Sequence, residues 1–238
     1  MRKMKKNKKT LIAGLITLMI GVTGCMSSSE KKNEEMLEHM QEKYGVEFEI
    51  QSYIPRSYAC SYDVWFCNAV GDDPEMDKIE VHRYYGDKAK DREYEDKYYS
   101  RMMRDEVERR AMEALEKVTD EAKAYISSLS FAGEEYKEPD QLDEFLQTEE
   151  GNRAFGMIVF ILDKEKDGIM NQDVVNKIVE VVPDAGIGDQ WFRIIFVGDE
   201  ATYKQIERNN CSDMIFLGNK ENKFTGDYAG TADIGITE

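Results

Sequence analysis

Three short, predominantly apolar runs constrain the fold of this chain more than any other feature. They are Met157–Leu162, Phe192–Val197 and Met214–Leu217, and none shows the alternation of a half-exposed strand. Such runs are typical of strands that are buried on both faces. Asn171 and Asp199 stand where each could cap a helix between two runs. The order strand, helix, strand, helix, strand predicts crossover units that cover a sheet.

The first half of the chain has a different pattern. Apolar residues at helical spacing over residues 34–44 predict a short helix that stops at Gly45. Apolar and polar residues then alternate in three segments, which predicts an antiparallel meander with one solvent-facing side. These segments are Val46–Ile54, Tyr62–Phe66 and Ile79–Val81.

The remaining segments complete the predicted architecture. An apolar stripe amid dense charge predicts a long helix over residues 91–119. A strand is expected near Ala124–Phe131, and Pro139 is suited to a first helical turn. The segment Gly218–Glu238 is rich in Gly, Thr, Asn and Asp, which predicts an extended arm. We therefore expect an α+β fold: an N-terminal helix, an antiparallel meander and a long helix, followed by alternating strand and helix units on a mixed sheet.

The N-terminal segment has the pattern of an export signal. Six basic residues and no acid accompany a 14-residue apolar run, Leu11 to Gly24. A spanning helix needs about 20 apolar residues, whereas a run of this length fits a signal-peptide core. The run ends Val22-Thr23-Gly24-Cys25, which resembles the lipobox of bacterial lipoproteins. That resemblance implies a diacylglyceryl group on the Cys25 thiol, cleavage before Cys25, and a mature chain that starts at this lipidated cysteine.

This interpretation gives a domain organisation and a location. Residues 1–24 are expected to be a lipoprotein signal peptide, residues 25–33 a flexible tether, and residues 34–238 a globular α+β domain. A seam near 119–139 would instead divide the globule into two small domains. The expected location is the extracytoplasmic face of the cell membrane, reached through the lipid anchor. The alternative is that Cys25 is an ordinary cysteine in a cleaved leader or an uncleaved anchor.

The charge balance restricts the partners. The whole chain carries a formal net charge of −16, and loss of the +6 leader would lower it to −22. Such a surface repels phosphate backbones and anionic lipid, so we expect no nucleic-acid partner. Contact with the membrane is therefore expected through the lipid at Cys25.

The other cysteines do not form a disulfide framework. Cys60, Cys67 and Cys211 remain after Cys25, and an odd number leaves at least one free or paired between chains. A bond between Cys60 and Cys67 would need a turn at Tyr62–Asp63. We interpret the three as small buried apolar residues.

No segment carries a convincing metal or nucleotide motif. Asp163–Asn171 places oxygen ligands and a glycine at the spacing of an EF-hand loop, but Val174 stands where that loop needs a bidentate glutamate. Gly186–Trp191 lacks the third glycine of a dinucleotide fingerprint and precedes a strand instead of following one. We interpret both segments as turns and expect neither a metal site nor a cofactor.

The chain has few histidines that could act in catalysis. The two histidines are His39, expected on the polar side of the first helix, and His82, expected to point outward beside Lys78 and Glu80. Neither accompanies a nucleophile motif such as G-x-S-x-G. We therefore expect no catalytic residues.

Aromatic residues are concentrated in the first half of the chain, and eight of the thirteen tyrosines lie between Tyr53 and Tyr99. About half are expected in the core, and Tyr85, Tyr99 and Trp65 are expected to be exposed. Exposed aromatic side chains stack on sugars or on protein partners. They are the candidate binding residues.

Together these features favour a membrane-anchored surface lipoprotein, a non-enzymatic binding or accessory module of the cell envelope. Its partner would be a protein or a cell-wall glycan. One alternative is an envelope hydrolase with an unrecognised acidic or metal site. Another is an immunity or exclusion lipoprotein whose acidic charge suits a basic incoming protein.

Overall fold

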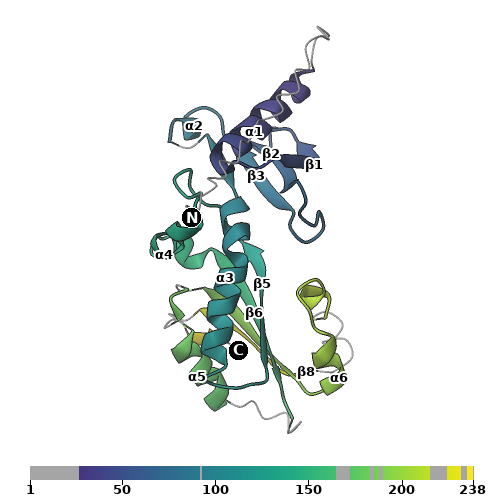
Figure 1. Cartoon of the computed structure of the whole chain (residues 1–238), viewed down its shortest axis with the longest axis vertical. Helices are drawn as coiled ribbons and strands as arrows, with labels where there is room; N and C mark the ends of the chain where they lie inside the picture. The colour runs from purple at the N-terminus through teal and green to yellow at the C-terminus, as the bar shows by residue number, and fades with distance from the viewer. Residues whose placement is uncertain are drawn as a thin grey trace, which may run out of the picture.

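The computed structural model describes residues 27–91, 93–164, 172–182, 185–187, 190–214, 224–231 and 235–237. Within these residues the chain has an α+β fold, as predicted, and its strands form two separate sheets (Figure 1). The first sheet is an antiparallel meander in the order β1-β2-β3-β4. Its strands are β1 (Phe48–Ile54), β2 (Asp63–Ala69), β3 (Ile79–Arg83) and β4 (Tyr94–Asp96).

The second sheet is mixed and has the order β5-β6-β7-β8-β9. Strands β6 and β7 run parallel, and the other neighbouring pairs run antiparallel. The strands are β5 (Ala122–Leu129), β6 (Phe155–Leu162), β7 (Trp191–Val197), β8 (Phe224–Thr231) and β9 (Gly235–Thr237). An isolated bridge between Asp96 and Ala132 links the end of the first sheet to the segment after β5.

Six labelled helices lie among the described residues, and residues 211–214 form a further helical turn. The labelled helices are α1 (Ser28–Tyr44), α2 (Lys88–Asp91), α3 (Tyr98–Leu115), α4 (Leu142–Phe145), α5 (Gln172–Val181) and α6 (Glu200–Gln205), with 3-10 turns at Pro139–Gln141 and Gly151–Arg153. The helix α5 supplies the crossover between the parallel strands β6 and β7, as the sequence predicts.

The first helix begins within the segment predicted to be a flexible tether. Ser27 caps it through a capping box: the Ser27 hydroxyl accepts from Glu30 N at 3.2 Å, and the Glu30 carboxylate accepts from Ser27 N at 2.6 Å. This pairing satisfies two backbone donors that would otherwise lack partners. Gly45 ends the helix in the left-handed conformation, as predicted. Helical order therefore starts at Ser28 and not at residue 34.

Two buried ion pairs fasten α1 to the meander. Lys32 Nζ lies 2.7 Å from Asp63 Oδ2 at the start of β2, and Lys43 Nζ lies 2.8 Å from Asp96 Oδ2 at the end of β4. Between the two lysines, the helix buries Met36 completely in the core of this half. Because each carboxylate is fully buried, loss of its lysine would leave an uncompensated charge.

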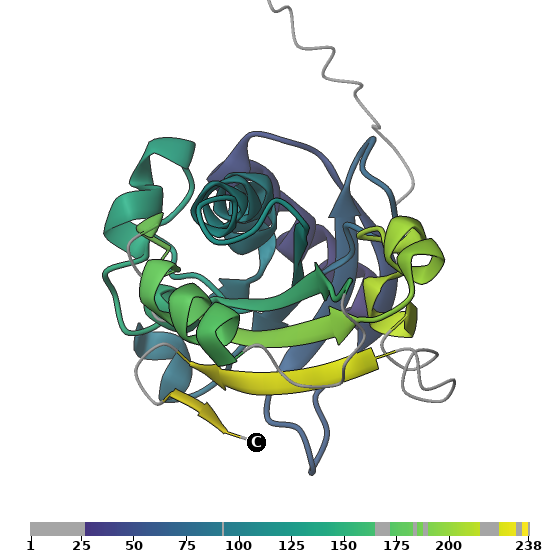
Figure 2. The ribbon, with the colours of Figure 1, turned by 90° about the horizontal axis from the view of Figure 1, so that it is seen from below.

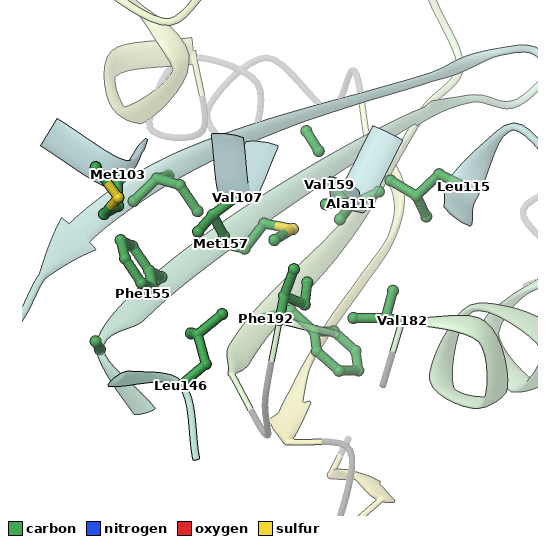
Figure 3. Close-up of a cluster of buried hydrophobic side chains, with 14 of the residues drawn as sticks. Met103, Val107, Ala111, Leu115, Leu146, Phe155, Met157, Val159, Val182 and Phe192 are labelled. Atoms are coloured by element: carbon green, nitrogen blue, oxygen red, sulfur yellow. The ribbon is translucent and has the colours of Figure 1, made fainter. Parts of the chain in front are cut away.

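A second core lies between α3 and the mixed sheet. Met103, Val107, Ala111 and Leu115 recur every fourth residue along one face of α3, so they form a continuous stripe. Figure 3 shows this stripe facing the side chains of β6 and β7. Viewed along α3, the helix lies over one face of this sheet (Figure 2). A smaller cluster on the other face packs beneath α6.

The predicted helix over residues 91–119 is too long. Its first part forms the end of α2 and the strand β4, where Tyr94 pairs with Arg83. Asp96 accepts hydrogen bonds from Lys43 and Tyr44, so tertiary partners hold this segment in the sheet. The apolar stripe of the helix begins only at Tyr98.

Two predictions near the C-terminal end are also wrong. Met214 closes a helical turn instead of opening a strand, and residues 215–217 lie outside the described residues. A short apolar run does not distinguish a buried strand from a buried helical turn. The segment predicted to be an extended arm supplies β8, antiparallel to β7, and β9. No helix among the described residues is long and apolar enough to cross a membrane.

Candidate functional site

A polar groove lies between the two sheets beside α3. Its volume is about 340 Å³. The first half of the chain contributes Met76, Lys78 and Lys97, α3 contributes Arg104, and β5 contributes the facing wall, Ile126–Leu129. Three of these side chains are cationic, although the whole chain carries a net charge of −16. The groove therefore differs in charge from the chain as a whole.

Two arginines of α3 hold one rim of the groove in place. Arg104 Nη2 donates to Asp77 Oδ1 at 2.7 Å, and its Nη1 donates to the Met76 carbonyl at 3.3 Å. Arg101 Nη2 lies 3.0 Å from Asp77 Oδ2 and 3.0 Å from Asp72 Oδ2. Burial alone would raise the pKa of Asp77, but the two guanidinium groups hold it below its usual value. The β2–β3 connection is therefore fixed to α3.

A second charged network positions Lys97 at the groove. Lys97 Nζ donates to Glu80 Oε2 at 2.9 Å, and His82 Nε2 makes a very short hydrogen bond with the other oxygen. Lys97 Nζ also lies 4.8 Å from the centre of the Phe131 ring. Burial alone would raise the pKa of Glu80, but the hydrogen bonds from Lys97 and His82 hold it below its ordinary value. Glu80 is therefore ionised at neutral pH and orients the ammonium group.

Three polar side chains of the groove are exposed, namely Lys78, Ser127 and Ser128. Lys78 is exposed, and no ion pair joins it to any residue in the described part of the chain. Ser127 Oγ donates to the Gly156 carbonyl at 3.1 Å, and Ser128 is exposed. Arg104 Nε is buried and has no hydrogen-bond partner within the described residues. An ammonium and a hydroxyl group can therefore reach a bound group from opposite walls.

An exposed tryptophan adjoins the β5 wall. Ser128 pairs with Gly156 on β6, and a methyl group at Gly156 would collide with Ser128 Oγ and lie 3.6 Å from Trp191 Cε3. Trp191 begins β7 and is 42% exposed. Ser128, Gly156 and Trp191 therefore form a row across three strands, which spans about 10 Å. The Ser128 hydroxyl fills the place that a side chain at Gly156 would take, so the glycine lets the serine and the indole pack over β6.

The three aromatic residues predicted to be exposed, Trp65, Tyr85 and Tyr99, do not line the groove. Trp65 and Tyr99 are completely buried, so this prediction is wrong for both. Trp65 lies beneath α1, where its Nε1 donates to Asn33 Oδ1 at 2.8 Å. The Tyr99 ring lies 5.2 Å from that of Phe145 in the second core. Tyr85 is half-buried and donates to Asp63, so all three serve packing.

The two histidines do not share a site. His82 is only 5% exposed, contrary to its predicted outward position, because the Tyr62 ring stacks on it and the Phe131 ring packs against it at a tilt. His39 stacks on Tyr94 at 4.1 Å between ring centres. The meander therefore has no fully solvent-facing side at β3. The absence of catalytic residues, which the sequence predicts, stays a prediction.

Cys60, Cys67 and Cys211 are free thiols. Cys67 and Cys211 are buried, as predicted, whereas Cys60 is partly exposed. Burial, with a further contribution from the charge of Asp96, raises the pKa of Cys67 to about 12. Cys25 lies outside the described residues.

The loops considered as metal or nucleotide sites have structural roles where they are described. Asp163 follows β6, and residues 165–171 lie outside the described residues. In the Gly186–Trp191 segment, Gln190 Oε1 accepts from Phe155 N at 2.7 Å, which ties the turn to β6. The Asp199 side chain caps α6 by accepting from Thr202 N at 2.8 Å, as predicted. No cluster of three potential metal-ligating residues occurs within the described residues.

Sequence reasoning did not find the groove residues. Arg101 and Arg104 look like ordinary charged positions of a helix, and nothing in the sequence places β5 opposite them. Trp191 stands at the start of an apolar run, which indicates burial and not exposure. The one available signal is Gly156 at the start of the β6 run, since a glycine there marks a close approach to another chain segment.

Comparisons with known proteins do not extend this description to a function. No family model matches the sequence, and no curated protein matches it. The chain is similar to a solved structure of a DUF5037 family protein from Ruminococcus gnavus, with 18% identity and a TM-score of 0.40. The similarity covers 72% of this chain and 77% of that chain.

Proposed function

We propose that this protein is a lipid-anchored binding module on the extracytoplasmic face of a bacterial membrane, with the inter-sheet groove as its binding site. The proposed lipid anchor is supported by the apolar run Leu11–Gly24, which is followed at once by Cys25 in the pattern of a lipobox. Acylation with two or more chains anchors a protein stably. The groove supplies the binding surface.

The position of α1 supports a short connection between the lipid and the fold. Cys25 precedes Ser28, the first helical residue, by three positions, which span at most about 11 Å. The 17-residue helix then extends about 25 Å to its end at Tyr44. Because Lys32 and Lys43 fix this helix to the meander, the domain would be held close to the membrane in a restricted range of orientations.

The character of the groove supports binding in preference to catalysis. Its cations are fixed by carboxylates of their own, as Lys97 is by Glu80 and Arg104 by Asp77. The hydroxyl of Ser127 in the lining donates to the Gly156 carbonyl and not to a carboxylate or an imidazole. Arrangements of this kind orient a ligand, whereas hydrolysis requires a positioned acid, base or metal.

The experiment is to fractionate bacterial cells that express the full chain or its Cys25→Ser variant. We expect the unmodified chain in the membrane fraction, released only by detergent, and the variant outside it. Treatment of intact protoplasts with a membrane-impermeant maleimide should label Cys60, and a Cys60→Ser variant provides the matched control. Equal fractionation of the two chains, or labelling only after lysis, would contradict the proposal.

A further inference from the structure

We infer that the loop between β1 and β2, residues 55–62, is a second contact with the membrane. Ile54, the last residue of β1, and Tyr58 within the loop would enter the interfacial layer of the same bilayer that holds the lipid on Cys25. This inference rests on the proposed anchor and deepens it, because a second contact would hold the domain in one orientation.

The β1–β2 loop lies beside the start of α1. Lys32 Nζ, in the second turn of the helix, lies 2.7 Å from Asp63 Oδ2 and donates to the Tyr53 hydroxyl at 3.3 Å. Asp63 Oδ1 in turn accepts from Arg56 N at 2.6 Å. The base of the loop is therefore fixed to the helix about one turn after Ser28.

This position puts the loop within reach of the bilayer. Ser28 follows Cys25 by three positions, which span at most about 11 Å, and Lys32 lies about 6 Å further along the helix. Tyr58 is two positions beyond Arg56 and can extend about 7 Å from the base of the loop. Figure 1 shows α1 and the meander at one end of the molecule and the mixed sheet at the other. The loop therefore belongs to the end of the molecule next to the anchor.

The exposed side chains of this segment suit a lipid interface. Tyr58 is fully exposed, and Ile54 is 51% exposed. A tyrosine favours the boundary of a bilayer, where its ring lies among the lipids and its hydroxyl group stays in water. An isoleucine side chain gains from removal of its apolar surface from water. The interface would therefore take up two apolar groups that the fold leaves in solvent.

The local charge does not oppose this contact. Residues 50–62 contain one basic residue, Arg56, and no acidic residue, although 48 of the 238 residues of the chain are acidic. After the leader, the other acid-free runs of similar length are 122–133 and 151–162, which contain strands of the mixed sheet. Repulsion from more distant acidic residues is screened beyond about 8 Å at physiological ionic strength. The β1–β2 loop can therefore approach lipid headgroups, unlike most of the acidic surface.

The contact is shallow. Side chains at an interface reach about 5–10 Å into the boundary between headgroups and acyl chains, and the headgroup region is hydrated. The Cys60 thiol donates to the Tyr62 carbonyl near the base of the loop, at 3.3 Å. Cys60 therefore stays in the hydrated region, where a water-soluble maleimide can reach it.

The test uses the acylated full chain in phosphatidylcholine vesicles whose acyl chains carry bromine near the headgroup. Bromine quenches a tryptophan only at close range. Tyr58→Trp adds one tryptophan to Trp65 and Trp191, and subtraction of the unmodified chain isolates its emission. We expect brominated lipid to quench most of this added emission. Val70→Trp is the matched control: Val70 is 53% exposed but follows the other end of β2, about 23 Å from Asp63, so its emission should not change.

A second pair of variants tests the role of the apolar side chain. Ile54→Asp, combined with Tyr58→Trp, should reduce the quenching, because a carboxylate loses hydration when it enters the interface. Val46→Asp places the same charge just before the other end of β1, at a residue that is 38% exposed, and should leave the quenching unchanged. Both positions are exposed, so neither change disturbs a core.

Flotation of the vesicles separates the two proposals. A chain that floats with the vesicles while the tryptophan of Tyr58→Trp stays unquenched would overturn the membrane contact and leave the anchor in place. Equal quenching in Val70→Trp, or quenching that Ile54→Asp does not reduce, would overturn it as well. A chain that does not float would contradict both the anchor and the contact.

Discussion

Asp63 and Asp96 lie on two different strands of the meander, and each is completely buried against a lysine of the same helix. Asp63 opens β2 and binds Lys32, while Asp96 closes β4 and binds Lys43. The lysines are 11 positions apart, about three turns, so they project from the same face of α1. This pair of contacts sets the direction in which the helix crosses the sheet.

Removal of Lys43 should destabilise the fold more than removal of Lys32. We expect Lys43→Met to lower the free energy of unfolding by about 3 kcal/mol, because Lys43 and Asp96 are both almost fully buried. Lys32→Met should cost about 1 to 2 kcal/mol, because Lys32 is a quarter exposed and Asp63 keeps the Tyr85 hydroxyl as a donor.

Urea denaturation measures both effects. Lys31→Met is the matched control, since its ion pair with Glu35 is exposed and 3.6 Å long, and its cost should not exceed about 0.5 kcal/mol. Equal costs for Lys43 and Lys31 would show that the buried pair does not fasten the helix.

Acid should destabilise the protein through Asp63. Burial alone would raise the pKa of this carboxyl, but hydrogen bonds from Lys32, Tyr85 and the Arg56 amide hold it below its ordinary value. The folded state therefore binds fewer protons than the unfolded state as the pH approaches the unfolded pKa of about 4. The stabilising contribution is complete above that pH and is lost as the pH falls through the lower folded pKa.

The measurement is the free energy of unfolding between pH 7 and pH 3. Asp63→Asn should start from a lower value and decline less steeply with acid than the unmodified protein. Glu34→Gln, at an exposed position of the same helix, should follow the unmodified curve. Parallel curves for Asp63→Asn and the unmodified protein would rule out this carboxyl as a source of acid sensitivity.

Two glycines should respond differently to a methyl group. A Cβ at Gly151 would collide with the Phe145 carbonyl, which belongs to the backbone and cannot move alone. A Cβ at Gly133 would meet only the carboxyl end of Glu135, which is flexible. We expect Gly151→Ala to cost about 2 kcal/mol and Gly133→Ala less than about 1 kcal/mol. Thermal unfolding of both variants checks this order, and a reversed order would contradict the packing around Phe145.

The three free thiols should differ in reactivity. Cys67 is completely buried, and this burial raises the pKa of its thiol to about 12. Almost no thiolate is therefore present at neutral pH. In Cys25→Ser, iodoacetamide at pH 8 should therefore modify Cys60 first and leave Cys67 protected. Peptide mass spectrometry reads the sites, and the same reaction in urea should modify all three cysteines. Rapid modification of Cys67 in the folded protein would contradict its buried position.

Local patterns predicted the elements well and their surroundings poorly. The parallel pair β6 and β7, the capped helix α6 and the meander follow from apolar runs, an aspartate and alternation, all of which are short-range signals. The burial of His82 depends on Tyr62 and Phe131, and Phe131 lies almost fifty positions away. The groove likewise joins Lys78, Arg104 and Ser128, which only the tertiary fold brings together. Its residues therefore carry no local signal.

The intact mass of the mature protein tests the central claim most directly. The full chain and its Cys25→Ser variant would be expressed in a bacterial host, purified from the fractions in which they reside, and weighed by mass spectrometry. The lipid-anchor account predicts a mass equal to residues 25–238 plus acyl groups, with the acyl mass absent from the variant. A chain that keeps residues 1–24, or a processed chain without added lipid, would contradict it.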